Sequence, residues 1–119
     1  MSETMSSTIY HACDGALWDE AQESGTYRGS ADDLRDGYIH FSTAVQLRVS
    51  VTKHRAGQDG LVLLTVDAAR LGDALRWEPS RDGQLFPHLY GTLPVAAVVR
   101  KESLPLDAGG VRKFPGWLP

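Results

Sequence analysis

Gly-Tyr-Ile-His-Phe-Ser-Thr, residues 37–43, is the segment around which we interpret the rest of the sequence. Its apolar and aromatic residues predict a short strand over Tyr38–Phe41. Ser42 or Thr43 then has a side chain suited to a helix N-cap, and the residues that follow predict a helix. The segment therefore places a histidine, His40, at the junction of a strand and a helix.

The sequence on both sides of this segment predicts one more helix and several more strands. Asp14 is a suitable N-cap and Gly25 a suitable end for a helix that reaches Ser24. Leu61–Val66 is nearly all apolar, as in a strand at the centre of a sheet that is covered on both faces. The other predicted elements are strands at Thr8–Cys13, Ala74–Glu78 and Val95–Arg100, helical turns at Ala31–Arg35 and Ala68–Leu71, and the end of the second main helix near Arg55.

A second segment, Leu85–Gly91, reads Leu-Phe-Pro-His-Leu-Tyr-Gly and again carries a histidine among aromatic residues. Because Pro87 has no N–H to donate, we expect an ordered loop or a bulged sheet edge there. Strands and helices do not alternate regularly along the chain, which favours an α+β domain over a doubly wound sheet. We therefore expect a single α+β domain over residues 8–119 and a disordered N-terminal extension over residues 1–7.

The composition argues against several classes of function. The chain has 119 residues, a formal net charge of −3 and no basic block, so a nucleic-acid partner is not expected. Cys13 is the single cysteine, so no internal disulfide forms, and we interpret it as a packed small residue rather than a nucleophile. No apolar run reaches the roughly 18 residues of a membrane span. Residues 1–8 lack the features of a signal peptide, so we expect a cytoplasmic protein.

His40, Ser42 and Thr43 form the first candidate site. A neutral imidazole both donates and accepts hydrogen bonds and titrates near physiological pH, so His40 is a candidate catalytic acid or base. Two hydroxyls and the unpaired backbone N–H groups of a helix start suit a phosphate or a carboxylate. The alternative is structural: a histidine bonded to a backbone carbonyl beside an ordinary Ser/Thr cap.

His88, Tyr90 and Gly91 form the second candidate site. The preceding proline stiffens the backbone, Tyr90 can stack on a planar ring, and Gly91 lets a ligand approach the backbone closely. The alternative is a structural loop whose aromatic residues fill the core. Since packing alone would favour Leu or Val at the histidine positions, we predict that His40 and His88 border one cleft, with His11 on its wall.

The remaining polar residues are weaker candidates. Glu78 is either a candidate catalytic base or the partner of Arg76 on one face of a strand. Tyr27 lies in the long polar loop after the first helix, where it either contacts a ligand or is merely solvated. No metal is expected, because a metal site needs three or four converging ligands and the four histidines lack the spacing of a zinc motif.

Taken together, these short motifs match a known family: the chain resembles the small bacterial proteins called domain of unknown function 952. The resemblance spans about Ile9–Val99, nearly the whole expected domain. It rests on motifs in the same order along the chain, namely Ile9-Tyr10-His11, Trp18, Gly25-Thr26-Tyr27, Gly37–Thr43 with Gln46, Leu63-Leu64, Asp67, Leu71, Trp77-Glu78, and Phe86–Gly91 with Leu93.

That family in turn resembles the ADP-ribosyltransferase fold, which implies two small sheets, two main helices and a cleft for NAD or an ADP-ribose-like group. In that superfamily a His or Arg on the first strand holds NAD, and His11 matches this position. Ser42 and Thr43 match a later strand-to-helix junction that supplies Ser-Thr or Tyr. Glu78 departs from the Glu-x-Glu form of the third position. His88 is the alternative there, and the phosphotransferase branch manages with His and Arg.

The sequence leaves three functions open. The first is an enzyme acting on NAD, ADP-ribose or a phosphorylated ribose, ADP-ribosyl- or phosphotransferase-like, with His40 or His88 moving protons. The second is a non-catalytic module that binds a nucleotide or another small anion, which the missing Glu-x-Glu form favours. The third is a protein-interaction domain whose tail, with Phe114 and Trp117 expected to pack on the domain, docks on a partner or a second copy. The ligand-contacting residues implied for a nucleotide or phosphate-bearing ligand are His11, Tyr27, Ser42, Thr43, Tyr90 and Gly91.

Overall fold

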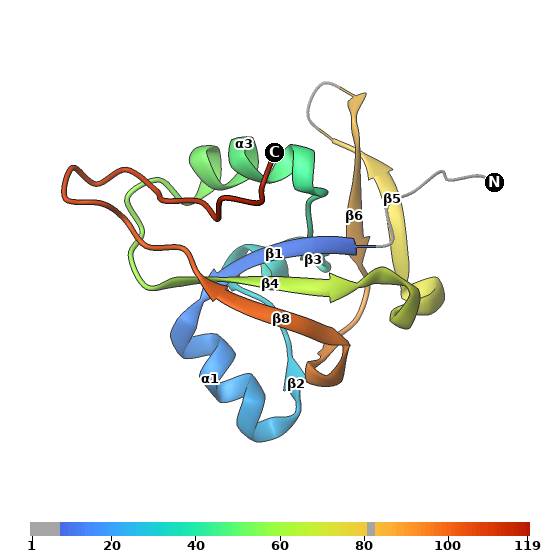
Figure 1. Ribbon diagram of the computed structural model, residues 1–119. Helices are drawn as coiled ribbons and strands as arrows, with labels where there is room; N and C mark the ends of the chain where they lie inside the picture. Colours follow the sequence, from blue (N-terminus) through green and yellow to red (C-terminus); the bar gives the residue numbers. More distant parts are fainter. Residues whose placement is uncertain (1–7, 81–82) are drawn as a thin grey trace.

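The fold is described from a computed structural model in which residues 8–80 and 83–119 are described (Figure 1). The extension expected over residues 1–7 lies outside the described residues. The α-helices are α1 (Gly15–Ser24), α2 (Ala31–Asp36) and α3 (Ala44–His54). The strands are β1 (Thr8–Asp14), β2 (Thr26–Tyr27), β3 (Ile39–His40), β4 (Leu61–Asp67), β5 (Leu75–Pro79), β6 (Leu85–Leu89), β7 (Leu93–Pro94) and β8 (Val98–Ser103). Short 3-10 helices occur at η1 (Ala68–Arg70), η2 (Gly72–Ala74) and η4 (Val95–Ala97).

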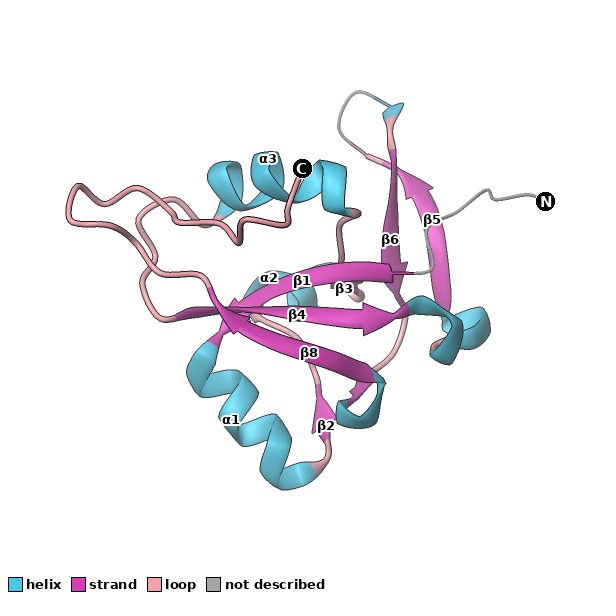
Figure 2. Ribbon diagram, in the orientation of Figure 1, coloured by secondary structure: helices cyan, strands magenta, loops and turns pink. Residues whose placement is uncertain are grey.

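Three small antiparallel sheets form among the described residues (Figure 2). The strand orders are β1-β4-β8, β2-β7 and β3-β6-β5. The α+β prediction is therefore confirmed, whereas the two sheets implied by the family resemblance are three here. Both main helices begin where their caps predicted: Asp14 accepts from the N–H of Ala16, and Thr43 accepts from the N–H of Gln46.

The β1-β4-β8 sheet is covered by helices on both faces, α3 on one and α1 on the other (Figure 1). Successive side chains of a strand point to opposite faces, so β4 supplies both cores. Leu64 and Val66 belong to a buried apolar cluster that includes Trp18 of α1. Leu61 and Leu63 belong to a second cluster that includes Leu47 of α3. The predicted central strand with no polar face is thus confirmed.

The prediction for Leu85–Gly91 was wrong, because β6 is the middle strand of the β3-β6-β5 sheet. Pro87 is tolerated there because it pairs with Trp77 on one side and meets the end of the short β3 on the other. Its carbonyl accepts the N–H of Phe41 at 3.0 Å, so the missing proline N–H costs only the reciprocal bond of this pair.

The predicted last strand also begins later than expected. Val95–Ala97 forms the turn η4, and β8 starts at Val98. The physical reason lies in the hydrogen bonding: the N–H of Val95 donates to the carbonyl of Gly25, in the turn after α1, at 3.1 Å instead of joining β4.

The C-terminal tail packs on the domain as expected. The ring of Trp117 lies 5.6 Å from the ring of Tyr10, and Leu118 is buried beside α3. The guanidinium of Arg48 on α3 donates to the carbonyls of Leu118 and Pro119 at 3.2 and 2.8 Å. These contacts fix the tail beside β1 and α3.

Truncating the central strand tests this description of the core. Leu63 is 0 % exposed, so Leu63→Ala leaves a cavity and is expected to lower the free energy of unfolding by about 2–5 kcal/mol. Val99→Ala is the control, because Val99 is 56 % exposed on β8 and its loss should change stability by no more than about 0.5 kcal/mol. Urea unfolding measures both, and equal losses for the two variants would contradict a core centred on β4.

Candidate functional site

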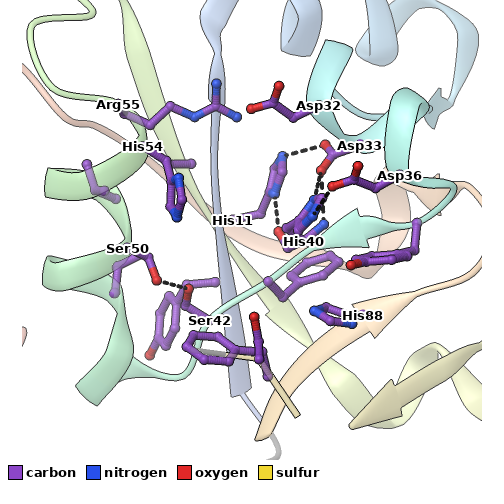
Figure 3. Close-up of a pocket in the computed structure, with 18 of the residues that line it drawn as sticks. His11, Asp32, Asp33, Asp36, His40, Ser42, Ser50, His54, Arg55 and His88 are labelled. Atoms are coloured by element: carbon purple, nitrogen blue, oxygen red, sulfur yellow. Dashed lines mark hydrogen bonds and ion pairs between the residues drawn. The ribbon is translucent and has the colours of Figure 1, made fainter. Parts of the chain in front are cut away.

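One pocket of about 330 Å³ opens between β1, β3, β6, α2 and α3, and all four histidines of the chain line it (Figure 3). His11 comes from β1, His40 from β3, His54 from α3 and His88 from β6. His40 and His88 pair across the antiparallel strands β3 and β6. The rings therefore border one pocket with His11, as the sequence predicted. Further lining residues are Tyr10, Asp32, Asp33, Asp36, Tyr38, Phe41, Ser42, Ser50, Arg55 and Phe86.

Asp33, on α2, holds the centre of the site. Its carboxylate is only 2 % exposed, and Oδ2 accepts the backbone N–H and the hydroxyl of Ser30 at 2.7 and 3.0 Å. Oδ1 accepts the backbone N–H and the ring Nδ1–H of His40 at 3.0 and 2.6 Å. Burial alone would raise the pKa of Asp33, but the bond from His40 and the nearby His11 and Ser30 outweigh it and lower that pKa. The group is thus a fixed negative charge.

His40 lies between two carboxylates. Its Nδ1 faces Asp33, and its Nε2 lies 2.9 Å from Oδ2 of Asp36. The hydrogen bond to Asp33 raises the pKa of His40, and Asp36 adds to the effect against the opposing influence of burial. Since a carboxylate only accepts, both ring nitrogens carry protons, and the ring is an imidazolium that is 38 % exposed.

His11 is the opposite case, a buried neutral histidine. Its Nδ1 lies 2.6 Å from the carbonyl oxygen of His40, which only accepts, so Nδ1 carries the proton. Nε2 then accepts the O–H of Tyr27 at 2.8 Å. Burial lowers the pKa of His11 despite the nearby Asp33. Both nitrogens are occupied by the protein, so His11 fixes the position of β3 rather than presenting a donor to the pocket.

His88 forms a second carboxylate–histidine pair. Its Nδ1 lies 2.7 Å from Oε1 of Glu78 on β5, which also accepts the O–H of Tyr90 at 2.7 Å. The bond from His88, followed by that from Tyr90, lowers the pKa of Glu78. Tyr38 stacks on the His88 ring, with centroids 4.1 Å apart. The sequence also offered Arg76 as a partner of Glu78, but the guanidinium of Arg76 lies over the ring of Tyr90.

The α3 side of the pocket carries hydroxyls and a guanidinium. The hydroxyl of Ser42 donates to that of Ser50 at 3.2 Å, and Arg55 follows the last turn of α3. Figure 3 shows Arg55 and His54 on this side and the aspartates of α2 on the other. The pocket thus has the Arg55 guanidinium on its α3 side, whereas its α2 side carries three aspartates and Arg35.

Several predicted site residues lie elsewhere. Thr43 caps α3 and exchanges hydrogen bonds with Gln46, so part of the predicted anion site at this helix start is already satisfied, and Thr43 does not line the pocket. Tyr27 is a buried β2 residue behind His11, not a loop residue. Glu78, Tyr90 and Gly91 also lie outside the pocket lining, although Glu78 and Tyr90 reach it through His88. Burial raises the pKa of Cys13 to about 12, which agrees with its interpretation as a packed residue.

Sequence reasoning missed Asp33, Asp36, Ser50 and Arg55. A signal for Asp33 was present: Ser30-x-x-Asp33 has the spacing of a capping box, and both of its hydrogen bonds form. Gly37 then ends α2 in the left-handed conformation (φ 88°), which a side chain would strain. That turn returns the chain so that His40 meets the carboxylates of α2.

The described residues contain neither a group of side chains suited to a metal ion nor a helix suited to a membrane. No group of three or more His, Cys, Asp or Glu side chains in residues 8–80 and 83–119 is arranged to hold a metal ion. Over the same residues, no helix has both the length and the apolar composition needed to cross a membrane.

The fold and the site together define a small α+β domain whose histidines converge on one polar pocket. The chain belongs to the family described as Protein of unknown function (DUF952), which matches residues 12–101. The family predicted from the sequence motifs is therefore confirmed. None of the curated proteins matches the chain.

Solved structures of one relative resemble the chain. The crystal structure of protein CC0527 from Caulobacter crescentus is 47 % identical, with a TM-score of 0.85 over 89 % of this chain and 93 % of that one. The solution NMR structure of CC0527 is 46 % identical, with a TM-score of 0.79 over 91 % of this chain and 93 % of that one. Both support the fold described above.

Removing the central carboxylate tests the architecture of the site. Asp33→Asn leaves donors of Ser30 and His40 without their anion, so we expect the free energy of unfolding to fall by about 3–5 kcal/mol at neutral pH. Asp32→Asn is the matched control, because the Asp32 side chain is 49 % exposed and forms a surface ion pair with Arg35, and it should cost no more than about 0.5 kcal/mol.

The pH dependence of this difference follows from the two pKa shifts. The pKa of Asp33 is lowered from 3.8, so its contribution is present above that value and is lost as the pH falls toward the folded-state pKa. The pKa of His40 is raised from 6.5, so its contribution is lost as the pH rises through the raised value. Urea unfolding of both variants across pH should show the largest effect between these limits, and a pH-independent difference would contradict the ion pair.

Proposed function

We propose that the pocket binds a phosphorylated ribose, such as the ribose phosphate part of NAD or ADP-ribose. The observation that carries the proposal is the convergence of all four histidines and Arg55 on one pocket of about 330 Å³. This volume lies at the lower end of small-molecule sites. It suits one nucleoside phosphate, so the remainder of a dinucleotide would extend into solvent.

The charge distribution orients such a ligand. A guanidinium and hydroxyls suit a phosphate, so the phosphate contacts Arg55, Ser50 and Ser42 on the α3 side. Carboxylates accept hydrogen bonds from ribose hydroxyls, so the sugar faces Asp36 and His40 on the α2 side. Aromatic rings of the lining offer stacking surface for a planar base.

The proposal includes transfer chemistry of the ADP-ribosyltransferase or phosphotransferase kind, with NAD as the candidate substrate. Its support is the motif resemblance together with a charged, oriented His40 in the pocket. The resemblance implies that His11 holds NAD from the first strand, but the nitrogens of His11 are held by Tyr27 and the His40 carbonyl. In this proposal His11 therefore positions His40 instead of holding the ligand directly.

A non-catalytic module that binds the same ligand is the second candidate. The observation that favours it is that both nitrogens of His40 are already held by carboxylates. Incubation with labelled NAD separates the candidates, because consumption of NAD requires an enzyme and binding without consumption leaves the module.

Calorimetric titration with ADP-ribose tests the proposed binding site. An anion prefers the imidazolium form of His40, so affinity should be high below the pKa of His40 and should fall as the pH rises through it. Because the carboxylates raise this pKa above 6.5, the fall belongs at higher pH than for an isolated histidine.

Two variants and one control complete the experiment. His40→Ala should weaken binding and remove most of the pH dependence, whereas Ser42→Ala should weaken binding and keep it, since a hydroxyl does not titrate in this range. Asp19→Asn, on the exposed side of α1, should behave like the wild type. Failure of the wild type to bind ADP-ribose, NAD and inorganic phosphate would eliminate the proposal.

A further inference from the structure

The histidine rings of two carboxylate–histidine pairs lie side by side at the pocket. His40 Nδ1 is held by Asp33 at 2.6 Å, and His88 Nδ1 is held by Glu78 at 2.7 Å. The two histidines are opposite one another on β3 and β6. Their ring centres are 5.7 Å apart and the rings meet at 69°. Each ring is thus oriented by a carboxylate, and both border the same pocket.

The two pairs differ in the partner of Nε2. A carboxylate accepts, so Nδ1 of each ring carries a proton. Nε2 of His40 faces a second carboxylate, Asp36, and carries a proton as well. His88 has one carboxylate partner in the described residues, Glu78 at Nδ1, so no carboxylate holds its Nε2. One ring can therefore give a proton while the other takes one.

We propose that His40 and His88 form a general acid and general base pair that acts on a phosphate ester of the bound ligand. The inference rests on the proposed function, because it requires a phosphorylated ribose in the pocket. In the proposed orientation the ribose faces His40, so a phosphate ester on a ribose hydroxyl lies beside both rings. Two rings at this separation can reach two oxygens of that phosphoryl group. Pairs of titratable groups held in different protonation states are the usual basis for dividing acid and base roles.

The reaction balances without an oxidant, a reductant or a metal. Nε2 of His88 takes the proton of a water molecule as its oxygen forms a bond to phosphorus. The bond from phosphorus to the leaving ribose oxygen breaks, and Nε2 of His40 gives its proton to that oxygen. Solvent then removes the proton from His88 and returns one to His40, so each turnover consumes one water and leaves a phosphate monoester when the substrate is a cyclic diester.

Charged and titratable groups surround both rings. Asp33 and Asp36 on α2 face His40, and Arg35 neutralises part of Asp36 at 3.0 Å. Glu78 on β5 faces His88, and His11 on β1 lies behind His40. Tyr38 contacts both rings, with its centroid 4.7 Å from that of His40 and 4.1 Å from that of His88, and Arg76 pairs with His88 across the sheet. The Asp36 side chain is 31 % exposed, and in the proposed mechanism it leaves His40 when a substrate enters.

Adenosine 2′,3′-cyclic phosphate is the probe, and its hydrolysis by the full chain is followed by phosphorus NMR. The expected profile of kcat against pH is a bell, since His88 must be neutral and His40 charged. His40→Gln and His88→Gln should each lower kcat by at least about 100-fold, the usual contribution of one acid or base. Circular dichroism of each variant establishes that the fold is retained.

Asp36→Asn provides a variant that does not risk the fold, because Asp36 is part-exposed at the end of α2. Removing this carboxylate lowers the pKa of His40, so the falling limb of the bell should move to lower pH while the rising limb stays in place. A merely structural role would not move one limb alone. Asp19→Asn on α1 is the control and should leave both limbs unchanged.

The outcomes separate this inference from the proposed function. Calorimetric binding of ADP-ribose without hydrolysis of the cyclic phosphate would overturn the acid–base pair and keep the binding site. Hydrolysis that persists in His40→Gln or His88→Gln would overturn the assigned roles. Absence of binding and hydrolysis together would overturn both proposals, whereas a bell whose falling limb moves with Asp36→Asn supports the pair.

Discussion

The buried carboxylate of Asp33 is the interaction on which the site depends. It completes the first turn of α2 through Ser30 and holds both the backbone and the ring of His40. His40 in turn fixes His11 through its carbonyl. A buried anion is costly unless it is fully hydrogen-bonded, so these partners have to form together. These hydrogen bonds fix α2, β3 and β1 relative to one another, and this arrangement determines the shape of the pocket.

Packing provides the frame around this polar centre. β4 buries apolar side chains on both faces, which places α1 and α3 on opposite sides of one sheet. The pocket lies on the side of α3, where Leu47 and Val51 belong both to the core and to its lining. A polar site built on a packed wall of this kind is rigid, because side chains in a well-packed core have few alternative rotamers.

The sequence was most informative where local physics decides the structure. The caps at Asp14 and Thr43, the apolar run of β4 and the convergence of His40 and His88 could all be predicted. Pro87 misled the assignment of β6, because its place in the sheet depends on the short length of β3. Propensity alone does not show which neighbour a strand has, and tertiary pairing decides such cases.

Among the site residues, too, the sequence did not show which roles are set by tertiary contacts. Asp33 was one of several acidic residues in a polar segment. Its burial and its bond to His40 separate it from Asp32, whose side chain is 49 % exposed. Thr43 was predicted to contact a ligand because it lies at the start of a helix. In the structure its backbone N–H and its hydroxyl are hydrogen-bonded to Gln46 instead. A hydroxyl at a helix N-terminus has two uses, and the sequence does not distinguish capping from ligand binding.

The spacing of the two carboxylate–histidine pairs has a kinetic consequence. Each pair is local, because His40 is seven positions from its aspartate and His88 ten positions from its glutamate. The contact between the two histidines instead joins β3 to β6, on either side of the whole of α3 and β4. Contacts between distant parts of a chain form slowly, because closing the long loop between them costs entropy before the contact contributes any stability. Each pair can assemble early during folding, and the pocket itself is completed only when the two halves of the chain meet.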